Sequence, residues 1–286
     1  MKDNTQGVWV LHDETQIYLI CEEGTIHFNA LFEGIRIADV GPGSPEPVYH
    51  FEQFSGSDGS RLVNFAYDSF PFFLVFRLAS RNLYDWRLVV NEMRSLFYRE
   101  DPYYICYSGE PGKRFRVVPE PWEVQKIMPQ KGMFALSFTV FPGSSESIAS
   151  TQSNFDLEED WQFSQGLVAE EYQYTHETSR FIIFNGGDFT IDPREHDLTI
   201  RIEGESDGEF ILFNRTTGDR FIYYPPLHRR YGESLVLESV YPRKNGVSCG
   251  IDTNHGVITL APGENHIELQ NISRVKSEWD FRFLYK

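Results

Sequence analysis

The sequence predicts a mainly β protein with one α-helix in its N-terminal half and a β-sandwich in its C-terminal half. Aromatic residues make up 15% of the 286 residues, with 24 Phe and 15 Tyr against 4 Met. Flat aromatic rings pack well on a pleated sheet. Short apolar stretches separated by turn residues recur along the chain, whereas one window alone has a helical period. At about 100–200 residues per domain, the length is most simply two domains.

In the N-terminal half, strands are expected where apolar residues alternate or cluster between turn residues. The clearest strand is 134–141, in which Phe134, Leu136, Phe138 and Val140 alternate strictly with other residues. Residues 41–47 and 56–60 are rich in Gly, Pro and Ser and are expected to form loops. Segments 113–118 and 134–141 could pair as a long hairpin. The expected strands are 8–11, 16–21, 25–32, 70–78, 103–108, 113–118 and 134–141.

One segment, 81–99, has apolar residues at three- and four-residue spacing, which is the pattern of an amphipathic helix. Asn82 is a suitable N-cap, Asp85 favours the first turn, and the Asp101-Pro102 pair ends the helix. Such a stripe usually packs on a sheet rather than forming a site. The side chains expected to be largely buried are Trp86, Val89, Met93 and Leu96.

The composition changes after residue 143. Residues 144–153 are Ser-rich and polar, so we expect an exposed linker that proteases cleave. The predicted domains are 1–143 and 181–286, joined by a connecting segment, 144–180. The strands expected in the second domain form a β-sandwich. They are 181–184, 198–202, 209–214, 220–224, 234–238, 257–260, 265–270 and 280–285.

The chain is acidic, with 42 Asp and Glu against 26 Lys and Arg, a net charge of −16. Such a charge makes general nucleic-acid binding and docking on an anionic membrane unfavourable. The three cysteines, Cys21, Cys106 and Cys249, are far apart and form no CxxC or Cys-His cluster. We therefore expect buried thiols rather than disulfides or a zinc site. The sequence predicts neither a secretory signal nor a membrane span.

No motif predicts catalysis, a metal site or a cofactor. Gly41-Pro42-Gly43 is not completed to a dinucleotide-binding pattern, since Glu46 takes the third glycine position. His196 lies between two acidic residues in a turn, where adjacent side chains diverge. A pair of carboxylates could hydrolyse glycosides, but no pair stands out. Four residues near a hairpin are interpreted as solvated surface rather than a site: Asp252, His255, Glu264 and His266.

The second domain is rich in tyrosines, and exposed aromatic rings can bind sugars by stacking. The candidates are Tyr223, Tyr224 and Tyr231. Tyr223 and Tyr224 are neighbours on an expected strand, so one of them alone can face a groove. Rings of this kind more often fill a core or a protein interface. We therefore expect no measurable sugar binding by this cluster.

The order of several segments resembles the distal tail protein family of long, non-contractile-tailed bacteriophages. In the N-terminal half, the resemblance is carried by 63–78, the helix 81–99, Tyr103-Tyr104-Ile105-Cys106-Tyr107, Gly112-Lys113-Arg114-Phe115 and the closing Phe141-Pro142. Further along it is carried by Trp161-Gln162-Phe163, Gly166-Leu167, 184–188, Ile191-Asp192-Pro193, 213–218, 260–265 and 280–285.

The resemblance implies a structural protein of the virion tail tip, made in the host bacterial cytoplasm, with no catalytic residues and no cofactor. Family members form a hexameric ring from β-sandwich-like N-terminal domains, around a channel through which DNA passes without specific binding. Their C-terminal domain resembles galectins and carbohydrate-binding modules. The implied partners are other copies of the chain, the tail tube protein and the tail-associated protein. No membrane partner is implied.

The family also joins neighbouring subunits through a β-hairpin belt, for which the ribbon 114–141 is our candidate. Pro119 and Pro121 interrupt that ribbon, which departs from a regular hairpin. An alternative function is a carbohydrate-binding adsorption protein that contacts the bacterial wall through its C-terminal sandwich. A third, an enzyme that hydrolyses wall glycans, has no residue to support it. The candidate ring-interface residues are Arg114, Arg116, Val118, Leu136, Phe138 and Val140.

Overall fold

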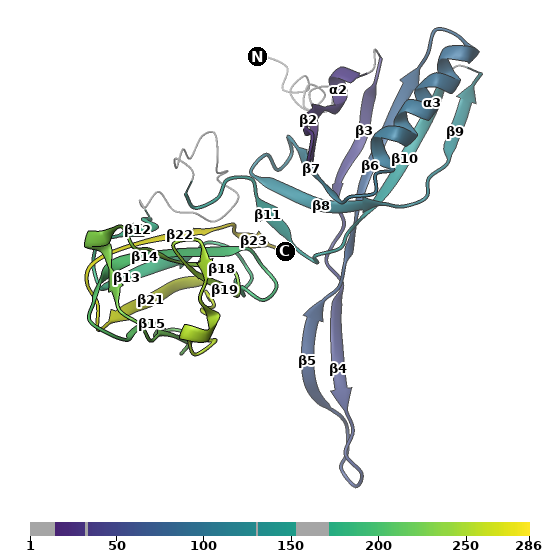
Figure 1. The fold of residues 1–286 in the computed structure, drawn as a ribbon. Helices are drawn as coiled ribbons and strands as arrows, with labels where there is room; N and C mark the ends of the chain where they lie inside the picture. The colour runs from purple at the N-terminus through teal and green to yellow at the C-terminus, as the bar shows by residue number, and fades with distance from the viewer. Residues whose placement is uncertain (1–14, 32–33, 130, 153–171) are drawn as a thin grey trace, which may run out of the picture. The chain divides into compact units, whose positions relative to one another are not determined.

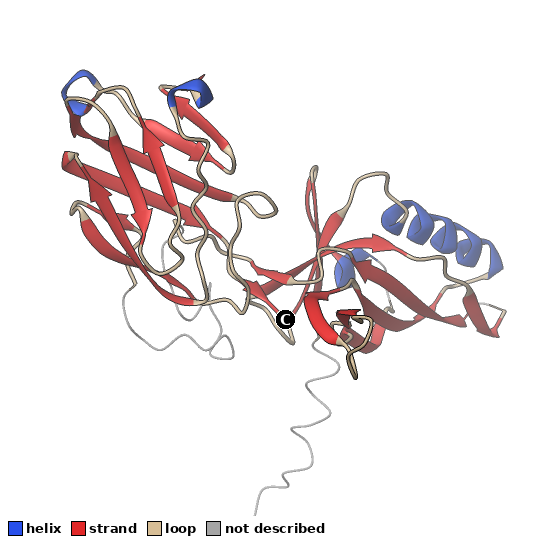
Figure 2. Ribbon diagram, turned by 90° about the horizontal axis from the view of Figure 1, so that it is seen from below, coloured by secondary structure: helices blue, strands red, loops and turns tan. Residues whose placement is uncertain are grey.

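The computed structural model describes residues 15–31, 34–129, 131–152 and 172–286 (Figures 1 and 2). The chain divides into two compact units, Met1–Ser145 with Lys286, and Glu146–Tyr285. The expected strand 8–11 and the segments 161–163 and 166–167 lie outside the described residues. Within the described ranges, no helix is long and apolar enough to cross a membrane.

The first unit is built on an antiparallel sheet in the order β2-β1-β7-β8-β10-β6-β3, with β9 also paired to β10. Inward-facing residues of β6 and β10 are directly opposed, so that Phe76 pairs with Phe134 and Phe72 with Phe138. All four rings are buried. The strands are β1 (Ile17–Cys21), β2 (Gly24–His27), β3 (Arg36–Pro42), β6 (Phe70–Ala79), β7 (Tyr103–Tyr107), β8 (Lys113–Pro119), β9 (Val124–Met128) and β10 (Lys131–Val140).

The predicted helix is confirmed as α3 (Leu83–Phe97). Asn82 is its N-cap, and its Oδ1 accepts hydrogen bonds from the backbone N–H groups of Tyr84, at 2.8 Å, and Asp85, at 3.0 Å. Trp86, Met93 and Phe97 are buried, whereas Val89 and Leu96 are only partly buried against the core. Among the described residues, α3 is the only helix longer than four residues.

A short helix, α2 (Phe28–Leu31), stands where the sequence predicted the end of a strand over 25–32. β2 ends at His27, and Phe28 turns inward to become fully buried against Phe76 and Phe97. The prediction was wrong here because the burial of one large ring outweighs the local alternation of apolar residues.

A long hairpin, β4 (Pro47–Glu52) and β5 (Arg61–Tyr67), extends from the β3–β6 pair (Figure 1). The Gly43 N–H donates to the Pro71 carbonyl at 2.6 Å and the Asp68 N–H to the Glu46 carbonyl at 2.9 Å, which links the two ribbons. β4 and β5 form a separate two-stranded sheet. Residues 41–47, predicted as a loop, thus contain the end of β3 and the start of β4, whereas 56–60 is the expected loop at the hairpin tip.

The second unit is a β-sandwich of a seven-stranded and a four-stranded sheet. The larger sheet has the order β12-β22-β14-β18-β19-β20 with β17 on β14, and the smaller has the order β13-β21-β15-β16. Trp279, Phe210 and Leu260 are fully buried in its core. The strands of the larger sheet are β12 (Thr175–His176), β14 (Leu198–Ser206), β17 (Leu227–His228), β18 (Leu235–Glu238), β19 (Tyr241–Lys244), β20 (Val247–Ser248) and β22 (Ser273–Phe281). Those of the smaller sheet are β13 (Arg180–Asn185), β15 (Phe210–Asn214), β16 (Arg220–Tyr223) and β21 (Gly263–Gln270).

The predicted fold class, mainly β with one long helix in the N-terminal half and a C-terminal sandwich, is confirmed. One expected strand, 257–260, is absent, because Leu260 makes only an isolated bridge with Ile191. The short strand β23 (Leu284–Tyr285) pairs with β11 (Ser145–Ser147), and two short 3₁₀ helices, Arg229–Tyr231 and Gly250–Asp252, complete the unit.

The Ser-rich segment 144–153 was expected to be exposed, and for residues 144–151 this was wrong. Ser147 and Thr151 are buried, and their hydroxyls bond to the backbone. The Thr151 hydroxyl donates to the Trp279 carbonyl at 2.8 Å and accepts from the Phe281 N–H at 3.1 Å. Small hydroxyl side chains can enter a core when the backbone satisfies them. Polar composition therefore did not imply exposure in this segment.

Candidate interaction surfaces

One face of the β4–β5 hairpin carries a row of four aromatic rings, of which Tyr49, Phe51 and Phe65 are exposed, whereas Tyr67 is half-buried with the Lys286 ammonium 5.3 Å from its ring centre. Tyr49 lies opposite Phe65 in the register, with ring centroids 5.1 Å apart, and Phe51 and Tyr67 extend the row. Tyr49 is 51% exposed and Phe51 60% exposed. A hairpin of two strands is marginally stable alone, and an exposed apolar patch commonly marks a protein contact. The row of Tyr49, Phe51, Phe65 and Tyr67 is called the aromatic face below.

A β-bulge lies near the middle of this hairpin, where the register shifts between His50 and Phe51. His50 pairs with Asn64 and Phe51 with Leu62, which leaves Val63 as the additional residue, 53% exposed. Bulges increase the twist of a ribbon and discourage uncontrolled pairing of its edges. The bulge therefore twists the hairpin and makes its edges poor partners for a further strand.

The predicted ribbon, 114–141, lies within the main sheet instead. β10 is hydrogen-bonded to β6 on one side and to β8 and β9 on the other, so both of its edges are paired within the chain. Leu136, Phe138 and Val140 are buried in the core of the first unit. They alternate because one face of the strand covers that core, and the same alternation would be seen at an interface.

The basic residues of the ribbon lie on the outward face of β8. The Arg114 guanidinium lies 3.9 Å from the centre of the Tyr104 ring. Arg116 is exposed, and its guanidinium lies 5.4 Å from the centre of the Phe141 ring. Val118 is half-buried. A role of these three residues in a subunit interface stays a prediction.

The three candidate tyrosines do not form one platform. Tyr223 is buried in the core of the sandwich, where it packs against Phe210, and burial raises the pKa of its phenol to about 12. Tyr224 and Tyr231 are 48% and 71% exposed. Tyr223, the last residue of β16, therefore points inward, whereas the neighbouring Tyr224 is exposed.

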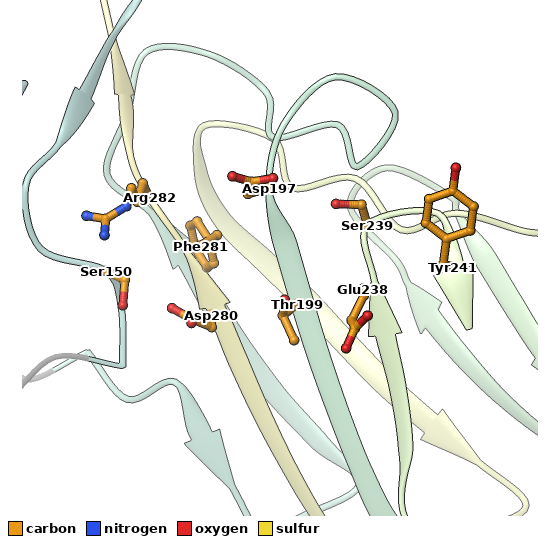
Figure 3. A pocket seen from close by; sticks show the side chains of 9 residues that line it. All are labelled: Ser150, Asp197, Thr199, Glu238, Ser239, Tyr241, Asp280, Phe281 and Arg282. Atoms are coloured by element: carbon orange, nitrogen blue, oxygen red, sulfur yellow. The ribbon is translucent and has the colours of Figure 1, made fainter. Parts of the chain in front are cut away.

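A polar groove that the sequence analysis missed lies on the outer face of the seven-stranded sheet (Figure 3). Thr199 of β14 pairs with Asp280 of β22 on one side and with Glu238 of β18 on the other. The groove has a volume of about 450 Å³ and is also lined by Tyr241 and Arg282. These residues are distant in sequence, and the sheet register alone brings them together.

His196, which was considered for catalysis, and the buried thiol of Cys106 are both held by the surrounding structure. His196 Nδ1 accepts a hydrogen bond from the Asp192 N–H at 3.1 Å, and burial lowers the pKa of His196. Cys106 is a free, buried thiol, and burial raises its pKa to about 12, which makes it a poor nucleophile. Over the described ranges, no group of three His, Cys, Asp or Glu side chains could hold a metal ion, including those near His255 and His266.

Comparisons with known proteins agree with this architecture. Residues 22–140 match the family model of the phage tail protein RIFT-related domain. The crystal structure of the SPP1 Dit (gp 19.1) protein, titled a paradigm of hub adsorption apparatus in Gram-positive infecting phages, matches with a TM-score of 0.66 and 11% identity. That match covers 94% of this chain and 99% of the SPP1 protein.

A chain in the structure of the phage P2 baseplate, in its activated conformation with Ca, matches with a TM-score of 0.41 and 9% identity, over 94% of this chain and 98% of that one. No curated protein matches the sequence. Residues 22–140 thus match the phage tail protein RIFT-related domain, and the predicted resemblance of the chain to the distal tail proteins of long, non-contractile-tailed phages is confirmed in its fold.

Proposed function

We propose that this chain is a structural hub of a phage tail tip, without enzymatic activity, and that six copies form a ring through their first units. The RIFT-related domain and the fold shared with the SPP1 hub protein support a hub role. The six-fold ring, its central channel for DNA and its position between the tail tube and the tail-associated protein are taken from the family resemblance. The chain would then reside in the virion, at the tail tip.

The observation that carries this proposal is the aromatic face of the β4–β5 hairpin. A closed ring of identical subunits needs one surface that complements a different surface of its neighbour. The aromatic face is an apolar surface on an extended ribbon, and a neighbouring copy would cover it. The β4–β5 hairpin therefore replaces the ribbon 114–141 as our candidate for the belt.

Charge supports a ring made by the first unit rather than the second. Up to Gly143 the chain has 13 basic and 18 acidic residues, a net charge of −5, whereas the remainder has 13 and 24, a net charge of −11. Close packing of six copies of the more acidic part would cost more electrostatic repulsion than packing the first. An acidic hub also suits a conduit that must not hold DNA tightly.

The test is the mass of the assembly in solution at high protein concentration, measured by sedimentation. Six copies of 33.3 kDa correspond to about 200 kDa, which is expected for the natural sequence. Phe51→Ser combined with Phe65→Ser should shift the protein to the monomer. Ile251→Ser is the matched control, since it removes a 91% exposed apolar side chain from the second unit. Assembly that survives the double substitution and is lost in the control would overturn the proposal.

Separate fragments provide a second test. The cut belongs between residues 145 and 146, because Ser147 and Thr151 bond to β22 and to Phe283 of the second unit. We expect assembly of residues 1–145 and not of residues 146–286. Assembly confined to the second fragment would contradict a ring built by the first unit.

A further inference from the structure

We propose that residues 8–11, which lie outside the described residues, pack into an apolar groove between α2 and α3 of the same chain and so join these two helices. This inference goes beyond the hub role, because it concerns how a single chain completes its own first unit. The groove, called the helix groove below, is lined by Leu31 of α2 and by Leu88, Asn91, Glu92, Ser95 and Leu96 of α3.

Helix α3 carries a second apolar stripe beside the one that faces the sheet. Leu88, Glu92 and Leu96 follow one another at four-residue spacing, so they lie on one flank of the helix. Leu88 is 61% exposed, and Leu96 is half-buried. The apolar stripe of a helix ordinarily packs against another element. The flank with Leu88 and Leu96 therefore has room for a further apolar segment.

Helix α2 supplies the opposite wall of the groove. Its Phe28 ring is buried against Phe97 of α3, with ring centroids 5.6 Å apart, and this contact holds the two helices together at one point. Leu31, one turn further along α2, is 44% exposed at the groove. The groove has a volume of about 510 Å³, within the roughly 300–1,000 Å³ of small-molecule sites. It can thus accept several apolar side chains.

The described chain begins beside this groove. Asn29 of α2 donates from Nδ2 to the Thr15 carbonyl at 2.7 Å and accepts at Oδ1 from the Ile17 N–H at 2.9 Å. Thr15 is thereby fixed to the same short helix that carries Leu31. An extended chain spans at most about 3.5 Å per residue, so residues 8–11 extend no more than about 14–25 Å from Thr15. They are confined to the neighbourhood of α2.

The composition of residues 8–11 matches the groove. They are Val, Trp, Val and Leu, an apolar run between polar stretches, and the sequence predicts a strand for them. Apolar side chains are driven out of water, and the leucines of the helix groove offer them an apolar surface. The family match begins at residue 22, so this segment is an addition that precedes the matched domain.

The rim of the groove can bond to the backbone of an extended segment. The N–H and C=O groups of such a segment need partners when it is covered. The Asn91 amide and the Ser95 hydroxyl donate and accept, whereas the Glu92 carboxylate accepts. All three residues are exposed. An apolar floor with this rim suits an extended apolar peptide.

The competing occupant is the aromatic face of another copy. That surface would have to bind from solution, whereas residues 8–11 are tethered to Thr15 a few positions away. A short tether gives an effective concentration on the order of millimolar, which favours the segment of the same chain.

The experiment is amide hydrogen exchange, followed by mass spectrometry, on the full chain at two protein concentrations about a hundredfold apart. We expect residues 8–11 to exchange about tenfold or more slowly than an unstructured peptide of the same sequence, equally at both concentrations. Exchange at the unstructured rate would overturn the proposal. Protection confined to the higher concentration would also overturn it, because the segment would then bind another copy.

Two substitutions locate the contact, one on each wall of the groove. Leu88→Ser and Leu31→Ser should each return the exchange of residues 8–11 to the unstructured rate. Leu83→Ser is the matched control, since it removes a 44% exposed leucine of α3 that does not line the groove. Circular dichroism and the melting temperature verify that α3 is retained in each variant. Protection that survives both wall substitutions, or that is lost equally in Leu83→Ser, would contradict the proposal. Neither readout requires a ring, so the hub role and this contact can fail separately.

Discussion

Two antiparallel ribbons of the first unit carry aromatic rings in cross-strand register and differ in what lies over them. In the β6–β10 ribbon, the Phe76 and Phe134 rings are stacked with centroids 4.8 Å apart, and both are fully buried. In the β4–β5 ribbon, Tyr49 and Phe65 lie 5.1 Å apart and are 51% and 42% exposed. Both ribbons are thus stabilised by the same kind of cross-strand aromatic pair.

The covering element makes the difference. Helix α3 places Trp86 against Phe134, with ring centroids 5.7 Å apart, and Phe97 against Phe138, at 5.5 Å. The β6–β10 ribbon therefore belongs to a core within one chain. Three of the four rings of the aromatic face, Tyr49, Phe51 and Phe65, are exposed in the single chain, so their stabilising contribution is expected to come from assembly. Four substitutions test this contrast through the free energy of unfolding.

The largest effect is expected for Phe134→Ala. The ring is fully buried and contacts the rings of Phe76, Trp86 and Trp122. Removing a buried Phe typically lowers the free energy of unfolding by about 3–5 kcal/mol. Urea denaturation of the first unit measures the loss. A loss of less than about 1 kcal/mol would show that Phe134 is not packed as a buried core ring.

A smaller loss is expected when the contact between helix and ribbon is overfilled. Gly132 is buried on β10, and a Cβ there would lie 2.5 Å from Cη2 of Trp86. Gly132→Ala must therefore displace the Trp86 ring, which should cost about 1–3 kcal/mol. The measurement is urea denaturation followed by tryptophan fluorescence. Gly208→Ala is a control, since nothing lies within 4 Å of the added Cβ. Equal stability of the natural protein and Gly132→Ala would indicate that α3 moves freely over β10.

Much of the covered ribbon was predictable from the sequence. Strict alternation from Phe134 to Val140 predicted β10, and the spacing of Trp86, Met93 and Phe97 predicted α3, because both patterns reflect burial on one face. The N-cap at Asn82 was predictable from residue type alone. These features depend on local sequence, so one chain without relatives is enough to find them.

The hairpin and the groove were not predictable in the same way. Pro47 and the glycines at 41 and 43 indicated a loop, but Pro47 begins an edge strand, where its missing N–H costs little. Alternation also cannot distinguish a strand whose apolar face is covered by its own chain from one covered by a partner. The groove depends on the pairing of Thr199 with Asp280, 81 positions later, and no local pattern contains that register.

A moderate effect is expected at the start of the covering helix. The Asn82 side chain accepts two backbone hydrogen bonds and donates from Nδ2 to Asp85 at 2.8 Å. Asn82→Ala should lower the free energy of unfolding by about 1 kcal/mol, and Asn82→Ser should recover most of it. Thermal denaturation of the three proteins measures this. A loss in Asn82→Ser equal to that in Asn82→Ala would mean that the cap does not stabilise α3.

The smallest effect on the single chain is expected for Phe51→Ser, and this result distinguishes the two ribbons most clearly. Phe51 is 60% exposed, so its replacement should change the free energy of unfolding of the monomer by no more than about 0.5 kcal/mol. The same substitution should weaken assembly, because the aromatic face would lose one of its four rings. Urea denaturation at a concentration where the protein is monomeric separates the two quantities. A loss of about 2 kcal/mol or more in the monomer would mean that the chain covers its own hairpin, and the contrast with Phe134 would fail.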